Sequence, residues 1–145
     1  MATTYDFFIS YPHKEREWVR RFVEALEQHN LKIWYDEKII PPGEPFVEKL
    51  REGLRNSNAM IYIVTLEALN SRWALMELGG ALGLKKKIIP LVAEDVPIGE
   101  LVPPIRRRRW LIKGDPVVNA NEVARAFSEN GNGATPAVSE LAAAS

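Results

Sequence analysis

Residues 59–65 read Ala-Met-Ile-Tyr-Ile-Val-Thr and form the most continuous apolar run of the chain. A short apolar run without alternating polar residues predicts a strand that is buried on both of its faces. Such strands are typical of the centre of a parallel sheet, because helices cover both sides of that sheet. We therefore expect residues 59–65 to be the central strand around which the rest of the chain is arranged.

Shorter apolar stretches on both sides of this run predict the other strands of the sheet. We expect strands at residues 5–11, 31–35 and 87–92, and an edge strand at residues 110–112. Segments with helical patterns separate these strands. The expected helices cover residues 14–28, 45–55, 71–83 and 121–127. Because strands and helices alternate five times, we predict an α/β fold with a parallel sheet, helices on both faces and right-handed crossovers.

The chain of 145 residues is long enough for one domain with a substantial core. We assign residues 1–127 to this domain. Residues 128–136 read Ser-Glu-Asn-Gly-Asn-Gly-Ala-Thr-Pro, a composition typical of linkers. Residues 128–145 are therefore expected to be a linker or C-terminal tail, which suggests a sensing domain beyond it or a separate partner.

The composition removes several classes of function. Nineteen basic residues balance nineteen acidic ones, so the formal net charge is zero and gives no reason to expect nucleic acid or a membrane as direct partner. The chain has no cysteine and two histidines, so thiol catalysis is excluded and no metal site is expected. We find no signal peptide and no membrane-spanning run, and expect a cytoplasmic protein.

Candidate functional residues gather where the strands end. Ligands of parallel α/β sheets bind beyond the carboxyl ends of the strands. Trp73 and Glu77 are four residues apart near the start of a predicted helix and therefore share one helix face. The crevice at this end of the sheet is expected to collect Ser10, Tyr11, Asp36, Lys38, Trp73 and Glu77. The alternative is that Trp73 packs in the core and Glu77 lies at the solvated edge of its helix.

Several common sites are missing from the sequence. No Gly-x-Gly-x-x-Gly motif follows a strand, and there is no phosphate-binding Walker motif. The four consecutive arginines at residues 106–109 are either a phosphate-binding cluster or, as is commoner beside an edge strand, a solvated face that resists aggregation.

Three motifs, in order, resemble those of the TIR (Toll/interleukin-1 receptor) domain family. Residues 5–11, Tyr-Asp-Phe-Phe-Ile-Ser-Tyr, resemble the first signature of that family. Trp34-Tyr35-Asp36, together with Ile-Pro-Pro-Gly at residues 40–43, resembles the second signature, the BB loop. Ser71-x-Trp73-x-x-x-Glu77-Leu78 resembles the helix of TIR enzymes that carries the catalytic glutamate. The resemblance covers most of the chain and implies a flavodoxin-like, five-stranded parallel sheet.

The resemblance implies one of two functions. TIR enzymes cleave NAD+ to nicotinamide and ADP-ribose or a cyclic ADP-ribose product, whereas adaptor-type TIR domains only bind one another through the BB loop. A carboxylate at Glu77 favours an NAD+ hydrolase of the bacterial type, with signalling or anti-phage defence (innate immunity) as its role. NAD+ is then the substrate, and no other cofactor is implied.

The same resemblance suggests roles for single residues. Glu77 is the expected catalytic carboxylate, because it can stabilise the positive charge that grows on the ribose. Ser10, Tyr11, Asp36 and Lys38 are expected to line the ribose and phosphate region. Trp34 or Trp73 is expected either to stack on nicotinamide or adenine or to belong to the core.

The loop from Ile39 to Pro45 is expected to mediate self-association. Its prolines stiffen it, so that docking costs little entropy, and its two isoleucines are suited to a docking surface. One departure from the family concerns Pro12 and His13, which stand where some family enzymes have a basic residue; His13 is a candidate partial substitute.

Overall fold

The computed structural model describes residues 5–35, 46–69 and 72–131, and it describes the side chains of residues 5–35, 51–69 and 77–128. Five strands form one sheet in the order β2-β1-β3-β4-β5, and every neighbouring pair is parallel. The strands are β1 (Tyr5–Ser10), β2 (Ile33–Trp34), β3 (Ser57–Val64), β4 (Lys87–Ala93) and β5 (Leu111–Lys113). The predicted five-stranded parallel sheet is therefore confirmed, with residues 59–64 of the predicted run in its central strand, which ends before Thr65.

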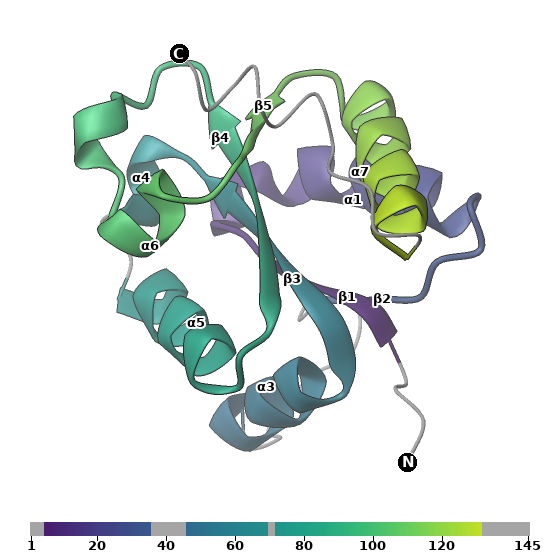
Figure 1. The fold of residues 1–145 in the computed structure, drawn as a ribbon, viewed down its shortest axis with the longest axis horizontal. Coiled ribbons are helices and arrows are strands. Elements are labelled where there is room, and N and C mark those ends of the chain that lie inside the picture. Colours follow the sequence, from purple (N-terminus) through teal and green to yellow (C-terminus); the bar gives the residue numbers. More distant parts are fainter. Residues whose placement is uncertain (1–4, 36–45, 70–71, 132–145) are drawn as a thin grey trace.

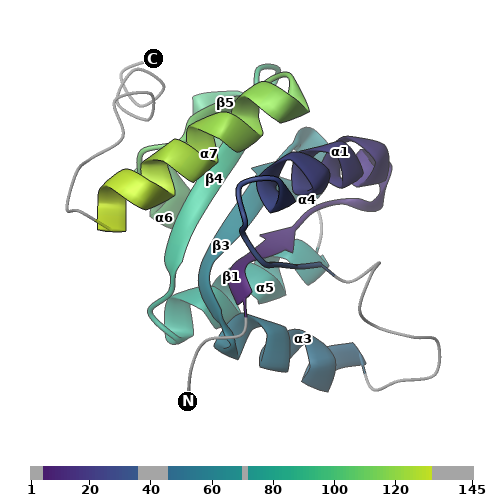
Figure 2. The same cartoon turned by 90° about the vertical axis from the view of Figure 1, so that its right-hand side faces the viewer.

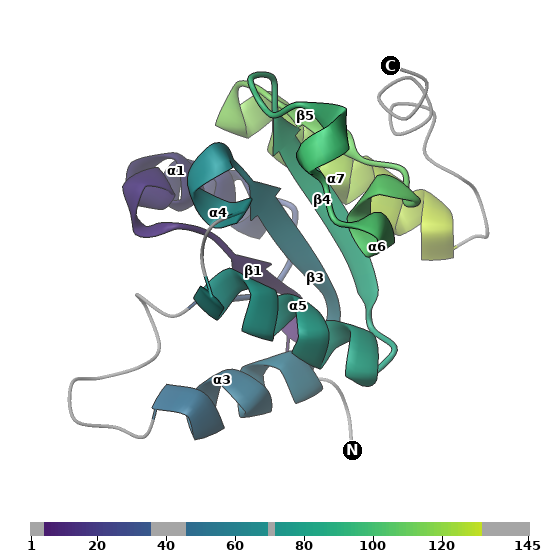
Figure 3. The same cartoon turned by 90° about the vertical axis from the view of Figure 1, so that its left-hand side faces the viewer.

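Helices cover both faces of this sheet (Figure 1). One face carries α1 (Arg16–Glu27) and α7 (Pro116–Gly131), which lie side by side in Figure 2. The other carries α3 (Phe46–Arg55), α4 (Leu66–Leu69), α5 (Arg72–Gly83) and α6 (Pro103–Arg106), seen in Figure 3. The short 3-10 turns η1 (His13–Glu15) and η2 (Ile98–Glu100) complete the described elements.

The alternating side chains of the strands divide the core into two parts. Phe8, Met60 and Tyr62 face the α3 and α5 side, whereas Phe7, Ile9 and Ile61 face the α1 and α7 side. This division follows from the two-residue period of a strand. All six of these side chains are almost completely buried, as expected for the inner strands of a sheet with helices on both faces.

The final helix was predicted too short at both ends. It begins at Pro116, not at residue 121, because Asp115 caps it: its Oδ2 accepts hydrogen bonds from the backbone N–H groups of Val117 and Val118. Aspartate at the N-cap with proline as the first helical residue is a recognised start signal. The helix runs to Gly131, so residues 128–131, predicted as the start of a linker, are helical; residues 132–145 lie outside the described part of the chain.

Two short helices lie in segments for which no helix was predicted. Helix α4 follows the central strand directly, and the Thr65 hydroxyl oxygen accepts a hydrogen bond from the N–H of Ala68. Helix α6 lies within the Pro- and Arg-rich segment, where Arg108 donates a hydrogen bond to the carbonyl of Pro104. Both helices have four residues, too few to show a 3.6-residue apolar period.

Candidate functional site

Glu77, in helix α5, is a buried residue. Only 5% of the residue is exposed, which is rare for a glutamate unless it is paired. Its Oε1 accepts a hydrogen bond of 2.5 Å from the hydroxyl of Ser10, the last residue of β1. Ser10 is itself 1% exposed. The prediction that Glu77 and Ser10 lie together is therefore confirmed, whereas the alternative of a glutamate at the solvated helix edge is wrong.

Tyr62 adds a third polar side chain to this pair. It lies on β3 directly beside Ser10, because these two residues are partners in the register of the parallel strands. Its side chain belongs to the core on the α5 side of the sheet. Burial, and secondly the negative charge of Glu77, raise the pKa of Tyr62 to about 12. Tyr62 was not predicted as a site residue, because a tyrosine within an apolar run looks like a core residue.

The end of β1 directs Ser10 and Tyr11 to opposite faces of the sheet. Ser10 meets Glu77 on the α5 side, whereas Tyr11 is half-buried against the α1 and α7 side. There its ring lies 6.3 Å from that of Tyr35, centroid to centroid, at 56°. Both residues were predicted to line one crevice, but among the described contacts only Ser10 meets Glu77. Successive side chains of a strand point to opposite faces of the sheet, which explains the difference.

Trp34 packs tightly in the core. The residue is 3% exposed, and its indole stacks on Phe8 with centroids 4.7 Å apart and planes at 9°. Gly53 of α3 lies against the indole, because a Cβ at Gly53 would stand 2.5 Å from Trp34 Cε2. Of the two roles that the sequence left open for Trp34, this packing favours the core role over contact with a ligand.

The remaining predicted contacts lie outside the part of the chain that the structure describes. Asp36, Lys38 and the loop of residues 39–45 belong to undescribed segments, and Trp73 lies in α5 with its side chain outside the description. His13 is exposed at the start of η1, where its Nε2 lies 3.4 Å from Arg16 Nη1.

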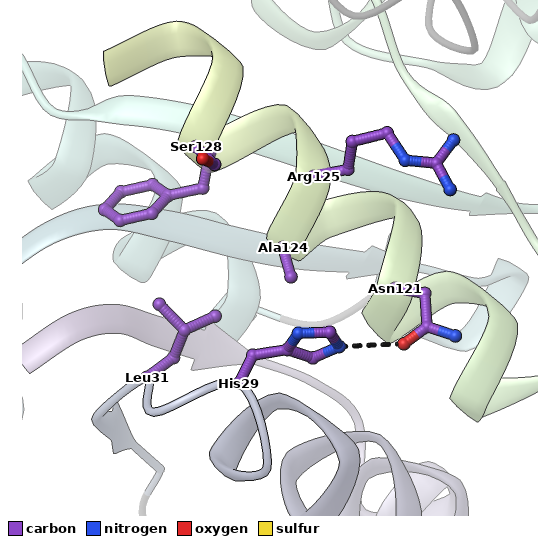
Figure 4. A pocket seen from close by; sticks show the side chains of 7 residues that line it. His29, Leu31, Asn121, Ala124, Arg125 and Ser128 are labelled. Carbon is purple, nitrogen blue, oxygen red and sulfur yellow. Dashed lines mark hydrogen bonds between the residues drawn. The ribbon is translucent and has the colours of Figure 1, made fainter. Parts of the chain in front are cut away.

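A hollow of about 610 Å³ lies elsewhere, between the end of α1 and helix α7 (Figure 4). His29 and Asn121 both line it and contact each other directly, with His29 Nε2 2.8 Å from Asn121 Oδ1. The lining residues are His29, Leu31, Asn121, Ala124, Arg125, Phe127 and Ser128. Because Leu31 precedes β2, this hollow lies at the amino ends of the strands, opposite the end where Ser10 meets Glu77, and ligands of such sheets bind at the carboxyl ends.

Two further features are absent from residues 5–35, 46–69 and 72–131. No group of three or more histidine, aspartate or glutamate side chains there is arranged to hold a metal ion. None of the helices in these ranges has the length and apolar character needed to cross a membrane.

The fold is that of a known family. A model of the TIR domain matches residues 7–125. Because this match covers most of the chain, the chain belongs to the TIR domain family. The crystal structure of the TIR domain of the Toll-related receptor TRR-2 from Hydra magnipapillata superposes with a TM-score of 0.66 and 26% identity, over 89% of this chain and 96% of that one.

Relatives with assigned activities are similar to part of this chain. The 2' cyclic ADP-D-ribose synthase AbTIR of Acinetobacter baumannii is 32% identical over 92 residues, 60% of this chain and 34% of AbTIR. The NAD(+) hydrolase TcpC of Escherichia coli O6:H1 is 36% identical over 77 residues, 52% of this chain and 25% of TcpC. The similarity thus spans about one third of AbTIR and one quarter of TcpC.

Proposed function

We propose that this TIR domain cleaves the bond between nicotinamide and ribose in NAD+, and that Glu77 is the catalytic carboxylate. The observation that carries the proposal is the buried Glu77, held by Ser10 at the carboxyl end of the sheet. Similarity to proteins named as an NAD(+) hydrolase and a 2' cyclic ADP-D-ribose synthase supports the same reaction class.

The chemistry of the bond explains why one carboxylate is sufficient. Nicotinamide in NAD+ is already cationic and leaves as a neutral base, so its departure needs no general acid. As the bond breaks, positive charge grows on the ribose, as in glycoside hydrolysis. A carboxylate fixed close to that charge stabilises the transition state more than the ground state. Burial of Glu77 strengthens this effect, because water screens the charge less in a buried site.

Ser10 has a supporting role in this proposal. Its hydroxyl donates to one carboxylate oxygen of Glu77, and a carboxylate can accept several further hydrogen bonds. We expect hydroxyl groups of the ribose to be further donors to this carboxylate. The product is ADP-ribose when water attacks the ribose carbon that nicotinamide leaves, and a cyclic form when a hydroxyl group of the same molecule attacks it; in both cases the attacking group loses a proton to solvent. Relatives are named as an NAD(+) hydrolase and as a 2' cyclic ADP-D-ribose synthase.

Self-association is the second part of the proposal. We expect the loop of residues 39–45 to dock on a neighbouring copy and to promote cleavage in the cytoplasm during signalling or defence. Three prolines in this loop reduce the entropy lost on docking. NAD+ is the proposed substrate, without a further cofactor.

The test incubates the purified protein with NAD+ over a range of protein concentrations and separates the products by chromatography. Wild type should release nicotinamide with a specific activity that rises with concentration, and Ile40→Asp should abolish the rise. Glu77→Gln should abolish release altogether, whereas the matched control Glu67→Gln, at an exposed position of α4, should match wild type. Wild type that releases no nicotinamide at any concentration would favour a TIR domain that acts only by binding other TIR domains.

A further inference from the structure

The hydroxyl of Tyr62 is a buried polar group with no hydrogen bond. Tyr62 is 1% exposed, and its hydroxyl finds no partner among the residues that the structure describes. Folded proteins pair the great majority of their buried polar atoms, because an unpaired buried donor costs free energy. A hydroxyl kept in such a place suggests a partner that it meets in another state of the site.

A carboxylate, that of Glu77, lies in the surroundings of this hydroxyl. Tyr62 and Ser10 are neighbours on adjacent strands, and Ser10 holds Glu77. The charge of Glu77 contributes to the raised pKa of Tyr62, about 12, after the larger effect of burial. At neutral pH the phenol therefore keeps its proton and is a hydrogen-bond donor beside a carboxylate acceptor.

We propose that Tyr62 is a positioning residue for Glu77, whose hydroxyl donates a hydrogen bond to the Glu77 carboxylate when substrate occupies the site. The inference rests on the proposed function. Cleavage requires Glu77 to present an oxygen to the ribose, whereas in the structure Oε1 is engaged by Ser10 at 2.5 Å. The Tyr62 hydroxyl, on the strand next to that of Ser10, is a second donor that holds the Glu77 carboxylate while the carboxylate turns toward the substrate.

The physical chemistry favours a bond of this kind. A hydrogen bond from a neutral hydroxyl to an ionised carboxylate is shorter and stronger than one between neutral groups. It also fixes the direction of the remaining lone pairs, and catalytic carboxylates depend on such fixed orientation. The competing explanation is a core tyrosine whose hydroxyl has no function.

Tyr62→Phe separates these explanations, because it removes only the hydroxyl. If Tyr62 positions Glu77, kcat for NAD+ cleavage should fall about tenfold, the change that one lost interaction of about 1.4 kcal/mol produces. KM should stay within about twofold, because the interaction is needed in the transition state and not for substrate binding. The melting temperature should stay the same or rise, since an unpaired buried hydroxyl is removed.

Met60→Leu is the matched control. Met60 is fully buried on the same strand and the same face as Tyr62, and an exchange that conserves volume is well tolerated. This variant should keep the wild-type kcat and KM.

The outcomes distinguish this inference from the proposed function. If wild type cleaves NAD+, Glu77→Gln does not, and Tyr62→Phe matches wild type in kcat and KM, the role of Tyr62 is wrong while the proposed function stands. A lower kcat that is accompanied by a lower melting temperature also contradicts the inference, because loss of folded protein then explains it. If wild type cleaves no NAD+ at any concentration, the proposed function and the role of Tyr62 fail together.

Discussion

Glu77 and Asn119 are both buried polar residues, but their hydrogen bonds differ in kind. Asn119 lies in α7, is 2% exposed and bonds with groups close to it in the sequence: it accepts from the N–H of Gly114 and donates to the carbonyl of Ile112 and to Glu122. Glu77 is bonded to Ser10, 67 residues away, and lies near a tyrosine hydroxyl without a bond.

We infer that this difference separates a structural polar residue, Asn119, from the proposed catalytic residue, Glu77. Asn119 replaces backbone hydrogen bonds where β5 turns into α7, so its role is complete within the folded chain. The Glu77 region buries a carboxylate and a phenol at the end of the sheet where ligands bind, and the hydroxyl of that phenol, Tyr62, has no hydrogen bond in the part of the chain that the structure describes. Mutations at the two regions should therefore affect different properties, stability in one and turnover in the other.

The largest effect on stability is expected from Trp34→Ala, which tests whether the indole near the Glu77 region belongs to the core. Truncating a buried tryptophan should cost about 3–5 kcal/mol in the free energy of unfolding, measured by urea titration. Trp34→Phe should lose less stability and should keep the cleavage activity per folded molecule. A Phe variant with wild-type stability but little activity would show instead that the indole contacts the substrate.

A smaller loss is expected from Asn119→Ala, because it leaves the Gly114 N–H and the Ile112 carbonyl without their partner. Both hydrogen bonds are only partly buried, and each should contribute about 0.5–1.5 kcal/mol, so their loss together should cost about 1–3 kcal/mol. Chemical denaturation measures this loss. Asn121→Ala makes the same change at an exposed position of α7 and should cost far less. Turnover per folded molecule should stay at the wild-type level in both variants; a fall confined to Asn119→Ala would remove the contrast with Glu77.

The smallest of these effects is expected from Ser10→Ala, which removes the donor to Glu77. Cleavage should fall about tenfold, as for one lost interaction that orients the carboxylate. Ser57→Ala is the matched control: Ser57 is equally buried, but its hydroxyl donates to the backbone carbonyl of Gly53. Equal turnover in the two variants would mean that the bond between Ser10 and Glu77 is structural.

The sequence predicted the layers of the fold well and the burial of the site poorly, for physical reasons. The continuous apolar run at residues 59–65 is a local feature of the sequence, and it identified the central strand. The sequence placed Ser10 and Glu77 in one crevice, but the burial of Glu77 and its hydrogen bond to Ser10 depend on how α5 packs on the sheet, which no local pattern encodes. The sequence therefore left open the alternative of a Glu77 at the helix surface, where exchange to alanine costs about 0.5 kcal/mol or less. In its buried position, Glu77→Ala leaves Ser10 without an acceptor, so Glu77→Gln is the better variant.

Tyr62 could have been suspected from the sequence by one signal. Its hydroxyl stands in the middle of a strand expected to be buried on both faces, where every polar atom needs a partner. That signal does not say which partner is near, because the register between β1 and β3 is a property of the folded sheet.

The most direct test of the central claim is the release of nicotinamide from NAD+ by wild type and by Glu77→Gln at equal, high protein concentration. Wild type should release nicotinamide, and Glu77→Gln should do so at least about a hundredfold more slowly, since loss of a preorganised charge at a transition state costs that much or more. The two proteins should have similar melting temperatures, because glutamine retains an acceptor for the Ser10 hydroxyl. Equal release by the two folded proteins would contradict the assignment of Glu77 as the catalytic carboxylate.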